Sequence, residues 1–309
     1  MADPAVVAIG VLALALVVDR LVGDPHSPCH PVALLGRLIG WWGRPSRWPV
    51  RFHRFIGILG FVGTVALFAA PYLAVDLLAP PLILLLAGPF LLKSCFALRA
   101  LEEHAREVER ALACDVDEGR AAAGLLVSRD TASLDADHVL SAAYESVSEN
   151  LVDSVTAPLL YFVTFGLGAA AAFRAVNTMD AMLGYHDERE RIGWASARAD
   201  DILTFIPARI TGAVLLIYFV LIGRGRAAWT CLRRDRHRRP GFNGGIPMAL
   251  IAGGVGVAFE KPGVYVIGTA ERPLAGAGTE IIRAVRAASV GTALLAAVAL
   301  FLWAAPANM

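Results

Sequence analysis

Long apolar runs alternate with polar segments along this chain. The runs cover residues 4–18, 55–75, 77–92, 155–173, 202–222, 246–259 and 287–305. Several approach the roughly 20 residues with which an α-helix crosses a bilayer. The first and third runs are short, and the run 246–259 is too short to predict a span. The pattern predicts an all-α, polytopic integral membrane protein that forms a single membrane domain over residues 1–309.

The polar segments between the runs carry most of the charge. Residues 99–154 are expected to form two amphipathic helices, the first with apolar and charged positions at helical spacing. The second is expected to begin near Ser133, whose side chain can cap it. Residues 223–239 contain seven arginines. Because basic segments stay on the cytoplasmic side, these amphipathic and arginine-rich segments are predicted to be cytoplasmic.

The run 155–173 raises a question of topology. If it and the run 202–222 both cross the bilayer, the polar segment 174–201 lies on the side opposite to residues 99–154. Gly166 and Gly168 in the middle of the run permit a turn, and non-helical backbone at membrane depth is tolerated where protein buries it. We therefore predict that the two runs are not both simple full spans with 174–201 outside.

Composition narrows the functional classes. Hydrophobic residues make up 57% of the chain and charged residues 18%, as expected of a membrane protein. The 28 basic residues nearly balance the 27 acidic ones, which argues against nucleic-acid binding. Only Lys93 and Lys261 are lysines, and no GxxxxGK[ST] phosphate loop is present. The four cysteines are isolated, which favours reduced, structural thiols. The first apolar run lacks a basic start and is expected to be a retained span.

The stretch "YESVSENLVDS" at 144–154 contains three carboxylates at intervals of four residues. On a helix, Glu145, Glu149 and Asp153 fall, with His138, within about 80° of one another. One interpretation is the solvated face of an amphipathic helix. The other is a cation site, because like charges at this spacing repel and a bound ion would relieve the repulsion. Magnesium suits such a site, since it binds one or two carboxylates together with phosphate oxygens.

Further polar residues follow in "AVNTMDAM" and "SARADDILTFIPAR". Asp200 and Asp201 point about 100° apart on a helix, so they cannot have the same role. One could bind metal while the other orients Arg198 or Arg209; local salt bridging at a membrane surface is the alternative. Asp180 is an oxygen ligand or part of a helix cap.

Three other side chains are candidates. Arg129 can bind phosphate as a forked donor or pair with a nearby aspartate. His30 lies in the proline-rich stretch "GDPHSPCHPV", which predicts a stiff extended loop. It is a general base or, more commonly, a structural hydrogen-bonding residue. Lys93 reaches the membrane interface or faces a polar interior.

The order and spelling of these motifs resemble the membrane-bound adenosylcobinamide-phosphate synthase (CobD/CbiB) family of cobalamin biosynthesis. The matching stretches include "DRLVGDPHSPCHPVALLGRLIG", "VSRDTASLD", "YESVSENLVDSVTAPLLYF", "AVNTMDAMLGY", "SARADDILTFIPARITG" and "FNGGIPMALIAGGVGVAFEKPGVYVIG". They cover residues 19–40 and most of 127–268, and the joined run from Ser128 to Gly212 is very specific. Ala181 and Thr204 depart from the family pattern, which weakens any role for those two side chains.

The resemblance implies an ATP-dependent ligase that forms an amide. Its substrates would be adenosylcobyric acid, through a propionate carboxyl, and aminopropanol or its phosphate. An acyl phosphate is the expected activated form, with Mg²⁺ and arginines offsetting the negative charge. The active site is expected on the cytoplasmic side of the cell membrane, with other late enzymes of the pathway as further partners. Two alternatives are a transporter, for which no inverted repeat is evident, and a non-catalytic membrane scaffold.

Site roles follow from the matching motifs. The catalytic candidates are Glu145, Glu149, Asp200, Asp201 and His30. The candidates for substrate and phosphate binding are Arg129, Asn150, Asn177, Arg198, Arg209 and Asn243. The metal candidates are Glu149, Asp153 and Asp180.

Overall fold

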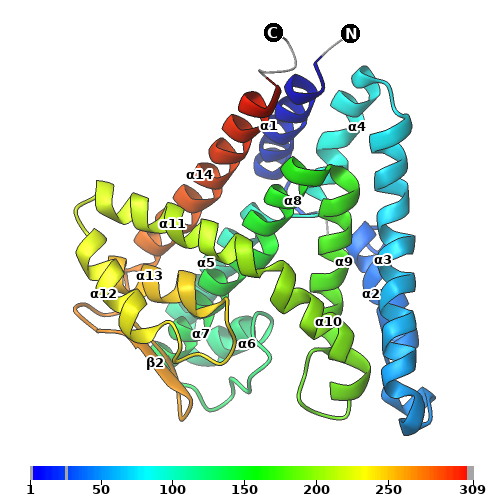
Figure 1. Ribbon diagram of the computed structural model, residues 1–309. Helices are drawn as coiled ribbons and strands as arrows, with labels where there is room; N and C mark the ends of the chain where they lie inside the picture. The colour runs from blue at the N-terminus through cyan, green and yellow to red at the C-terminus, as the bar shows by residue number, and fades with distance from the viewer. Residues whose placement is uncertain (1–2, 25–26, 305–309) are drawn as a thin grey trace. The chain divides into compact units, whose positions relative to one another are not determined.

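The chain folds almost entirely into helices (Figure 1). The computed structural model describes residues 3–24 and 27–304. Contacts divide the chain into two compact units. Unit 1 comprises Met1–Ala97, Ala157–Thr204 and Ala293–Met309, and unit 2 comprises Leu98–Thr156 and Phe205–Thr292. Each unit is therefore built from stretches that lie far apart in the sequence.

Unit 1 begins with long apolar helices. Its helices are α1 (Pro4–Val22), α2 (Pro31–Trp42), α3 (His53–Leu78), α4 (Pro81–Lys93), α8 (Ala157–Phe165), α9 (Leu167–Leu183) and α10 (Glu190–Leu203), with short 3₁₀ turns η1 (Pro45–Arg47) and η2 (Val50–Phe52). The sequence "DLLAPPL" makes the predicted turn, since α3 ends at Leu78 and α4 begins at Pro81. Residues 25–26 of the predicted proline-rich loop lie outside the described residues.

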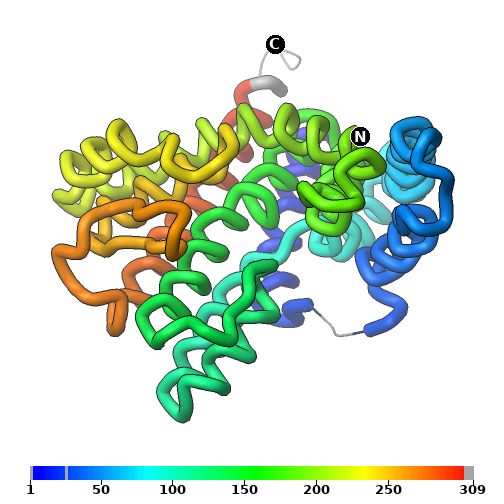
Figure 2. Tube along the Cα trace, turned by 90° about the horizontal axis from the view of Figure 1, so that it is seen from below, coloured from blue at the N-terminus to red at the C-terminus, as the bar shows by residue number. Residues whose placement is uncertain are grey.

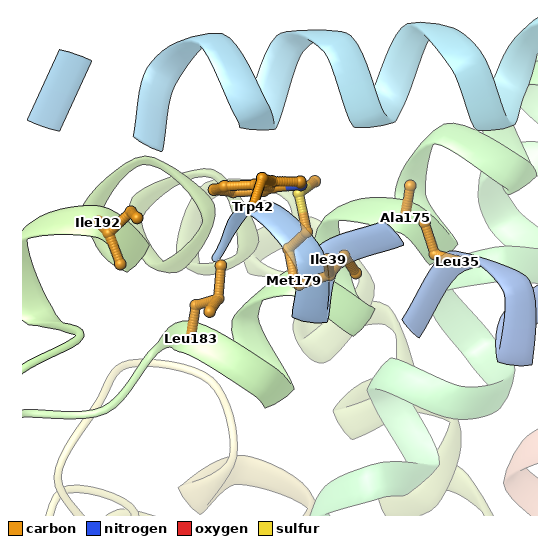
Figure 3. Packing of buried hydrophobic residues seen from close by; sticks show 7 residues of the cluster. All are labelled: Leu35, Ile39, Trp42, Ala175, Met179, Leu183 and Ile192. Carbon is orange, nitrogen blue, oxygen red and sulfur yellow. The ribbon is translucent and has the colours of Figure 1, made fainter. Parts of the chain in front are cut away.

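An apolar cluster joins α2, α9 and α10 (Figure 3). Leu35, Ile39 and Trp42 of α2 pack against Met179 and Leu183 of α9. The Trp42 indole nitrogen donates a hydrogen bond to Thr64 Oγ1 of α3 at 3.0 Å. Satisfying this polar atom lets the large indole be buried, so the cluster fixes α9 within unit 1.

The run 155–173 is broken, as its glycines predicted. Helix α8 ends at Phe165, Gly166 adopts a φ of +86°, and α9 begins at Leu167. Asp76 of α3 accepts a hydrogen bond from the Gly168 backbone nitrogen at 2.8 Å and thereby caps the new helix. A Cβ atom at Gly166 would lie 2.7 Å from Asp76 Oδ2, so only glycine fits at this turn. The run is therefore not one full span.

Unit 2 contains the amphipathic helices and the site-bearing helix. Its helices are α5 (Leu98–Cys114), α6 (Val116–Gly124), α7 (Ala136–Leu151), α11 (Phe205–Leu221), α12 (Gly225–Asp235) and α13 (Gly245–Val255), with a π-helical turn η3 (Val152–Thr156) after α7. Helix α14 (Gly278–Ala304) contributes residues to both units. Figure 2 shows α5, α6 and α7 as neighbouring tubes of unit 2, and these helices contact one another.

Two expectations for residues 99–154 were wrong. Three helices replace the two expected, and α7 is capped by Asp135 rather than Ser133. Asp135 precedes the helix with extended backbone, and its Oδ1 accepts from the His138 backbone nitrogen at 2.9 Å. The burial of Val139, Ala143 and Val147 confirms the predicted apolar face of α7.

A β-hairpin, which the sequence pattern did not predict, follows α13. Strands β1 (Ala258–Lys261) and β2 (Tyr265–Gly268) pair antiparallel, with Lys261 opposite Tyr265. Helix α13 ends at Val255 because Gly256 adopts the left-handed conformation, so the apolar run 246–259 is a short helix and part of a strand.

Five helical segments are long and apolar enough to cross a membrane. They are Pro4–Val22, Val50–Leu78, Pro81–Cys114, Glu190–Leu221 and Gly278–Leu302. They overlap with five of the seven apolar runs of the sequence; the two exceptions are the broken run 155–173 and the short run 246–259. The mainly helical fold with several candidate spans confirms the predicted fold class.

Candidate functional site: arginine–carboxylate clusters

Glu145 is the most enclosed carboxylate of α7. It is 3% exposed, and each of its carboxylate oxygens contacts at least one donor. Oε1 lies 2.7 Å from Ser141 Oγ and 3.0 Å from Arg129 Nη2. Oε2 accepts from the Tyr265 hydroxyl at 2.6 Å. Burying a carboxylate is costly unless it is hydrogen-bonded, and Glu145 has three such donors.

The Arg129 guanidinium has a second nitrogen that can donate a hydrogen bond. Its Nη2 contacts Glu145, whereas Nη1 is buried and has no hydrogen-bond partner among the described residues. A buried donor without a partner is costly, so the position suits an anionic group of a ligand. The guanidinium fork could then bind the carboxylate and the ligand together.

Glu149 lies one helical turn after Glu145 and pairs with Arg239. The two Arg239 nitrogens Nε and Nη2 contact Oε2 and Oε1 of Glu149 in a forked ion pair. Burial acts to lower the pKa of Arg239, but the contact with Glu149 outweighs it and raises that pKa. The repulsion expected between the carboxylates of α7 is therefore offset by arginines in this structure.

Asp153 departs from the regular helix. It lies in the π-helical turn Val152–Thr156, so its direction differs from the position on an ideal α-helical wheel. Such π-helical turns are frequent at functional sites. Its negative charge acts on Arg239, so it belongs to the same electrostatic cluster as Glu149.

The β-hairpin brings Tyr265 to Glu145. The Glu260 backbone nitrogen of β1 donates to Ser141 Oγ at 2.6 Å. At the end of β2, the Gly268 backbone nitrogen donates to Asp235 Oδ2 of α12 at 2.9 Å. The hairpin is thereby held at both strands, by α7 and by α12. Burial, together with Glu145, raises the pKa of Tyr265, so the phenol remains a hydrogen-bond donor.

Asp235 is the anchor on the α12 side. It is fully buried, and Arg234 contacts both its oxygens at 2.8 and 2.7 Å. Arg238 Nε lies 3.0 Å from Oδ1. Burial acts to raise the pKa of Asp235, yet the hydrogen bonds from Arg234 and Gly268 hold it below its ordinary value. Part of the arginine-rich segment therefore stabilises the fold of unit 2.

Arg209 and Asn243 form a second polar contact in unit 2. Arg209 Nη1 donates to Asn243 Oδ1 at 2.8 Å and to the Phe205 carbonyl at 2.8 Å. The guanidinium also lies over the Phe205 ring at 3.3 Å. Asn150, by contrast, turns back onto its own helix, where its Nδ2 donates to the Ser146 carbonyl at 2.9 Å.

The remaining acidic candidates belong to unit 1. Asn177 Nδ2 donates to Asp200 Oδ1 at 3.3 Å, which joins α9 to α10. Asp200 is 8% exposed, whereas Asp201 faces Arg198 at 3.9 Å on the more exposed side. The two aspartates thus have different surroundings, as their spacing predicted. Asp180 lies on α9, one turn after Asn177.

His30 caps α2. Its Nδ1 accepts from the Val32 backbone nitrogen at 3.3 Å, while Nε2 lies 4.0 Å from Asp24 Oδ1. Burial is the main cause that lowers the pKa of His30, and the neutral ring fits a capping acceptor. The structure gives His30 a structural role, and its role as a general base stays a prediction.

Lys93 faces a polar interior. Its Nζ lies 2.7 Å from Asp24 Oδ1 and 3.2 Å from Asp19 Oδ1, and the lysine is 5% exposed. Of the two alternatives for Lys93, the structure favours the buried one over the membrane interface. A buried cation requires such partners.

The three carboxylates proposed as metal ligands do not form one group in this structure. Among the described residues, no three histidine, cysteine, aspartate or glutamate side chains gather as a metal site would require. Both Glu149 oxygens contact Arg239; Asp153 belongs to unit 2 and Asp180 to unit 1. The arrangement of unit 2 suits an anion near Arg129 better than a metal held by carboxylates alone. The assignment of Glu149, Asp153 and Asp180 to a metal stays a prediction.

Sequence reasoning missed three members of the site: Ser141, Arg239 and Tyr265. Arg239 was visible only as part of a basic run, and Tyr265 only within a matching motif. Arg239 and Tyr265 contact α7 from 90 or more residues away in the sequence. Ser141 lies on α7 itself, four residues before Glu145. The spacing of Ser141 and Glu145 was the available signal, since residues at i and i+4 meet on a helix.

The fold and the site define a class: a helical protein with several candidate membrane spans and buried arginine–carboxylate clusters. A family profile described as "CobD/Cbib protein" matches residues 12–295. The chain is 41% identical over 262 residues to the "Probable cobalamin biosynthesis protein CobD" of Methanothermobacter thermautotrophicus, covering 84% of this chain and 86% of the relative. Proteins with the same description from Thermococcus kodakarensis and Pyrococcus abyssi are 44% and 43% identical, with 82% of this chain and 82% and 83% of the relatives covered. No solved structure matches the chain significantly.

The chain belongs to the CobD/CbiB family of cobalamin biosynthesis. The match extends through both units and includes every candidate site residue. This confirms the resemblance that the motifs indicated.

Proposed function

We propose that this protein is an ATP-dependent ligase of the cell membrane that forms an amide bond in cobalamin biosynthesis. It attaches aminopropanol or aminopropanol phosphate to a propionate carboxyl of adenosylcobyric acid. The product is adenosylcobinamide or its phosphate. Membership of the CobD/CbiB family is the observation that carries this proposal.

The cluster on α7 supports anion recognition. Arg129 has one buried guanidinium nitrogen without a partner in the described part of the chain, while the other contacts Glu145. In this role, Arg129 binds a substrate carboxylate or phosphate, and Glu145 orients Arg129. Hydrogen bonds from Tyr265 and Ser141 hold the Glu145 carboxylate in place. A buried arginine with a preorganised partner stabilises developing negative charge without reorganisation.

Glu149 and Arg239 form the second part of the proposed site. Arg239 is available to a phosphate once its contact with Glu149 opens, and Glu149 then accepts a proton from the incoming amine. ATP and Mg²⁺ belong to the proposal: when bound, they supply the phosphoryl group that activates the propionate carboxyl. Glu149 of α7 and Asp153 of the π-helical turn after it would hold the metal together with phosphate oxygens.

The ligase is distinguished from its alternatives by coupling between substrates. Purified protein in detergent would be given ATP with the corrin acid alone, the amine alone, and both together. The proposal expects ATP consumption that requires both and yields the corrin amide. Exposed Glu107, which pairs with Arg110 on α5, supplies a matched control, since Glu107→Gln should leave ligation unchanged. ATP consumption that ignores either substrate, or none at all, would support the transporter or scaffold instead.

A further inference from the structure

A charged cavity lies in unit 2, outside the cluster on α7. It has a volume of about 530 Å³, enough for a small polar headgroup. Three arginines line it, Arg224, Arg272 and Arg283, together with two glutamates, Glu271 and Glu280. The lining therefore carries one more positive than negative charge.

The cavity is built on the carboxyl end of α13. Arg224 Nε donates to the Gly254 carbonyl at 3.0 Å, and the Arg272 backbone nitrogen donates to the Gly256 carbonyl at 3.1 Å. Arg224 also pairs with Glu271 at 2.7 Å. The Arg224 guanidinium is thereby held by two contacts, and the backbone of Arg272 is tied to the end of α13.

The arginines are not fully satisfied by the protein. Arg272 pairs with Glu280 at 3.3 Å through Nη1, but its Nε is buried and has no hydrogen-bond partner in the described part of the chain. Arg283 is exposed one turn after Glu280 and has no carboxylate within ion-pair distance among residues 3–24 and 27–304. An anion in the cavity would supply an acceptor for the exposed Arg283 guanidinium. Glu280 Oε2 is also buried without a hydrogen-bond partner among the described residues, and a phosphate does not satisfy it.

The other wall is apolar and belongs to a candidate membrane span. Tyr218, Phe219 and Ile222 line the cavity at the end of α11, whose span ends at Leu221. Neighbouring Ile217, Val220 and Leu221 are each more than half exposed. Helices α11, α12 and α13 contact one another in unit 2 (Figure 1). Arg283 lies near the start of the span Gly278–Leu302. The charged lining therefore lies where two candidate spans meet the polar part of unit 2.

We propose that this cavity binds the phosphate of an anionic phospholipid. Arg272 and Arg283 contact the phosphate, Tyr218 lies beside the glycerol, and the acyl chains follow the exposed face of α11. The arginine-rich segment that begins at Arg224 places this end on the cytoplasmic side by the charge rule, and lipids of that leaflet carry negative charge. An aromatic ring at the membrane–water boundary is also typical of such positions.

Binding would be measured on delipidated full-length protein in detergent, by native mass spectrometry with phosphatidylglycerol and with phosphatidylcholine. Phosphatidylglycerol is expected to bind at least 5-fold more tightly. Arg283→Gln should remove most of this preference, because Arg283 is exposed and its loss leaves the fold intact. Arg272→Gln should do the same. The matched control is Arg226→Gln on α12, an exposed arginine outside the cavity, which should change nothing.

A separate arm uses glycerol 3-phosphate and inorganic phosphate as soluble probes. The proposal expects them to compete only weakly, because they lack acyl chains to pack on α11. Binding of either soluble probe as tightly as phosphatidylglycerol would overturn the lipid assignment. Equal binding of phosphatidylglycerol by the wild type and by the Arg272→Gln and Arg283→Gln variants would overturn the site itself.

Discussion

Replacing Arg129 with glutamine tests the enclosed pair on α7 most sharply. The change removes the cation that faces Glu145 at 3.0 Å and leaves a carboxylate that is only 3% exposed. The glutamate would retain Ser141 and Tyr265 as donors but lose its charge partner. Because both donors are neutral, they compensate the buried charge only in part.

The expected magnitude follows from burial. Removing one partner of a buried ion pair costs about 3–5 kcal/mol of unfolding free energy. The two remaining hydrogen bonds place Arg129→Gln near the lower end, at about 3 kcal/mol. The double variant Arg129→Gln/Glu145→Gln leaves no buried charge and should lose only about 1 kcal/mol. The double-mutant cycle formed by these variants therefore predicts that the two losses of unfolding free energy are strongly non-additive.

Chemical denaturation in detergent, followed by tryptophan fluorescence, would give these free energies. The exposed pair of Arg110 and Glu107 on α5 is the control, with side chains 67% and 60% exposed. Arg110→Gln should change stability by less than about 1 kcal/mol, as expected for a surface pair. If Arg129→Gln is no more costly than Arg110→Gln, or if the double variant is simply additive, the account of Glu145 as a buried charge that depends on Arg129 is wrong.

Three further predictions concern activity and topology. Glu149→Gln should lower ligation by about 100-fold or more while the protein stays folded, because the forked pair with Arg239 is part of the proposed site; wild-type turnover at limiting magnesium would rule this residue out. Arg209→Lys should lower kcat/KM by about 10-fold, since a lysine cannot reproduce the planar guanidinium that stacks on Phe205 and contacts Asn243; near-normal kinetics would make Arg209 a packing residue. For topology, the predicted common side of residues 174–201 and 223–239 requires that the candidate segment Glu190–Leu221 does not cross the bilayer completely. Single cysteines at positions 187 and 226 of a cysteine-free variant should then show the same labelling by an impermeant thiol reagent on intact cells. Both positions are exposed, and labelling at 187 but not at 226 would place residues 174–201 outside and contradict the predicted topology.

Local features of the fold could be predicted from the sequence because they depend on neighbouring residues. The glycines of the run 155–173 predicted a turn, and Gly166 makes it. The apolar face of α7 followed from helical spacing alone. The cap of α7 was misplaced by two residues, because Ser133 and Asp135 are both good caps and only the backbone decides between them.

The site could be predicted only in part, because its partners come from distant stretches. The carboxylates of α7 were visible as a pattern, but their repulsion suggested a metal where the structure has arginines. Arg239 reaches Glu149 from 90 residues away, and Tyr265 reaches Glu145 from 120. Tyr265 arrives on a β-hairpin that the hydrophobic pattern concealed, since the run 246–259 extends through a helix end and into a strand.

The most direct test of the proposed ligase follows the oxygen atoms of the substrate. Adenosylcobyric acid labelled with ¹⁸O in the reacting propionate carboxyl would be incubated with purified protein, Mg-ATP and aminopropanol phosphate. Mass spectrometry would then be applied to the corrin and to the released phosphate. The account predicts a corrin with the mass of the amide and one ¹⁸O atom transferred to each phosphate released. Unchanged corrin acid with intact ATP would contradict the proposed function, and amide formation with unlabelled phosphate would contradict activation of the carboxyl as an acyl phosphate.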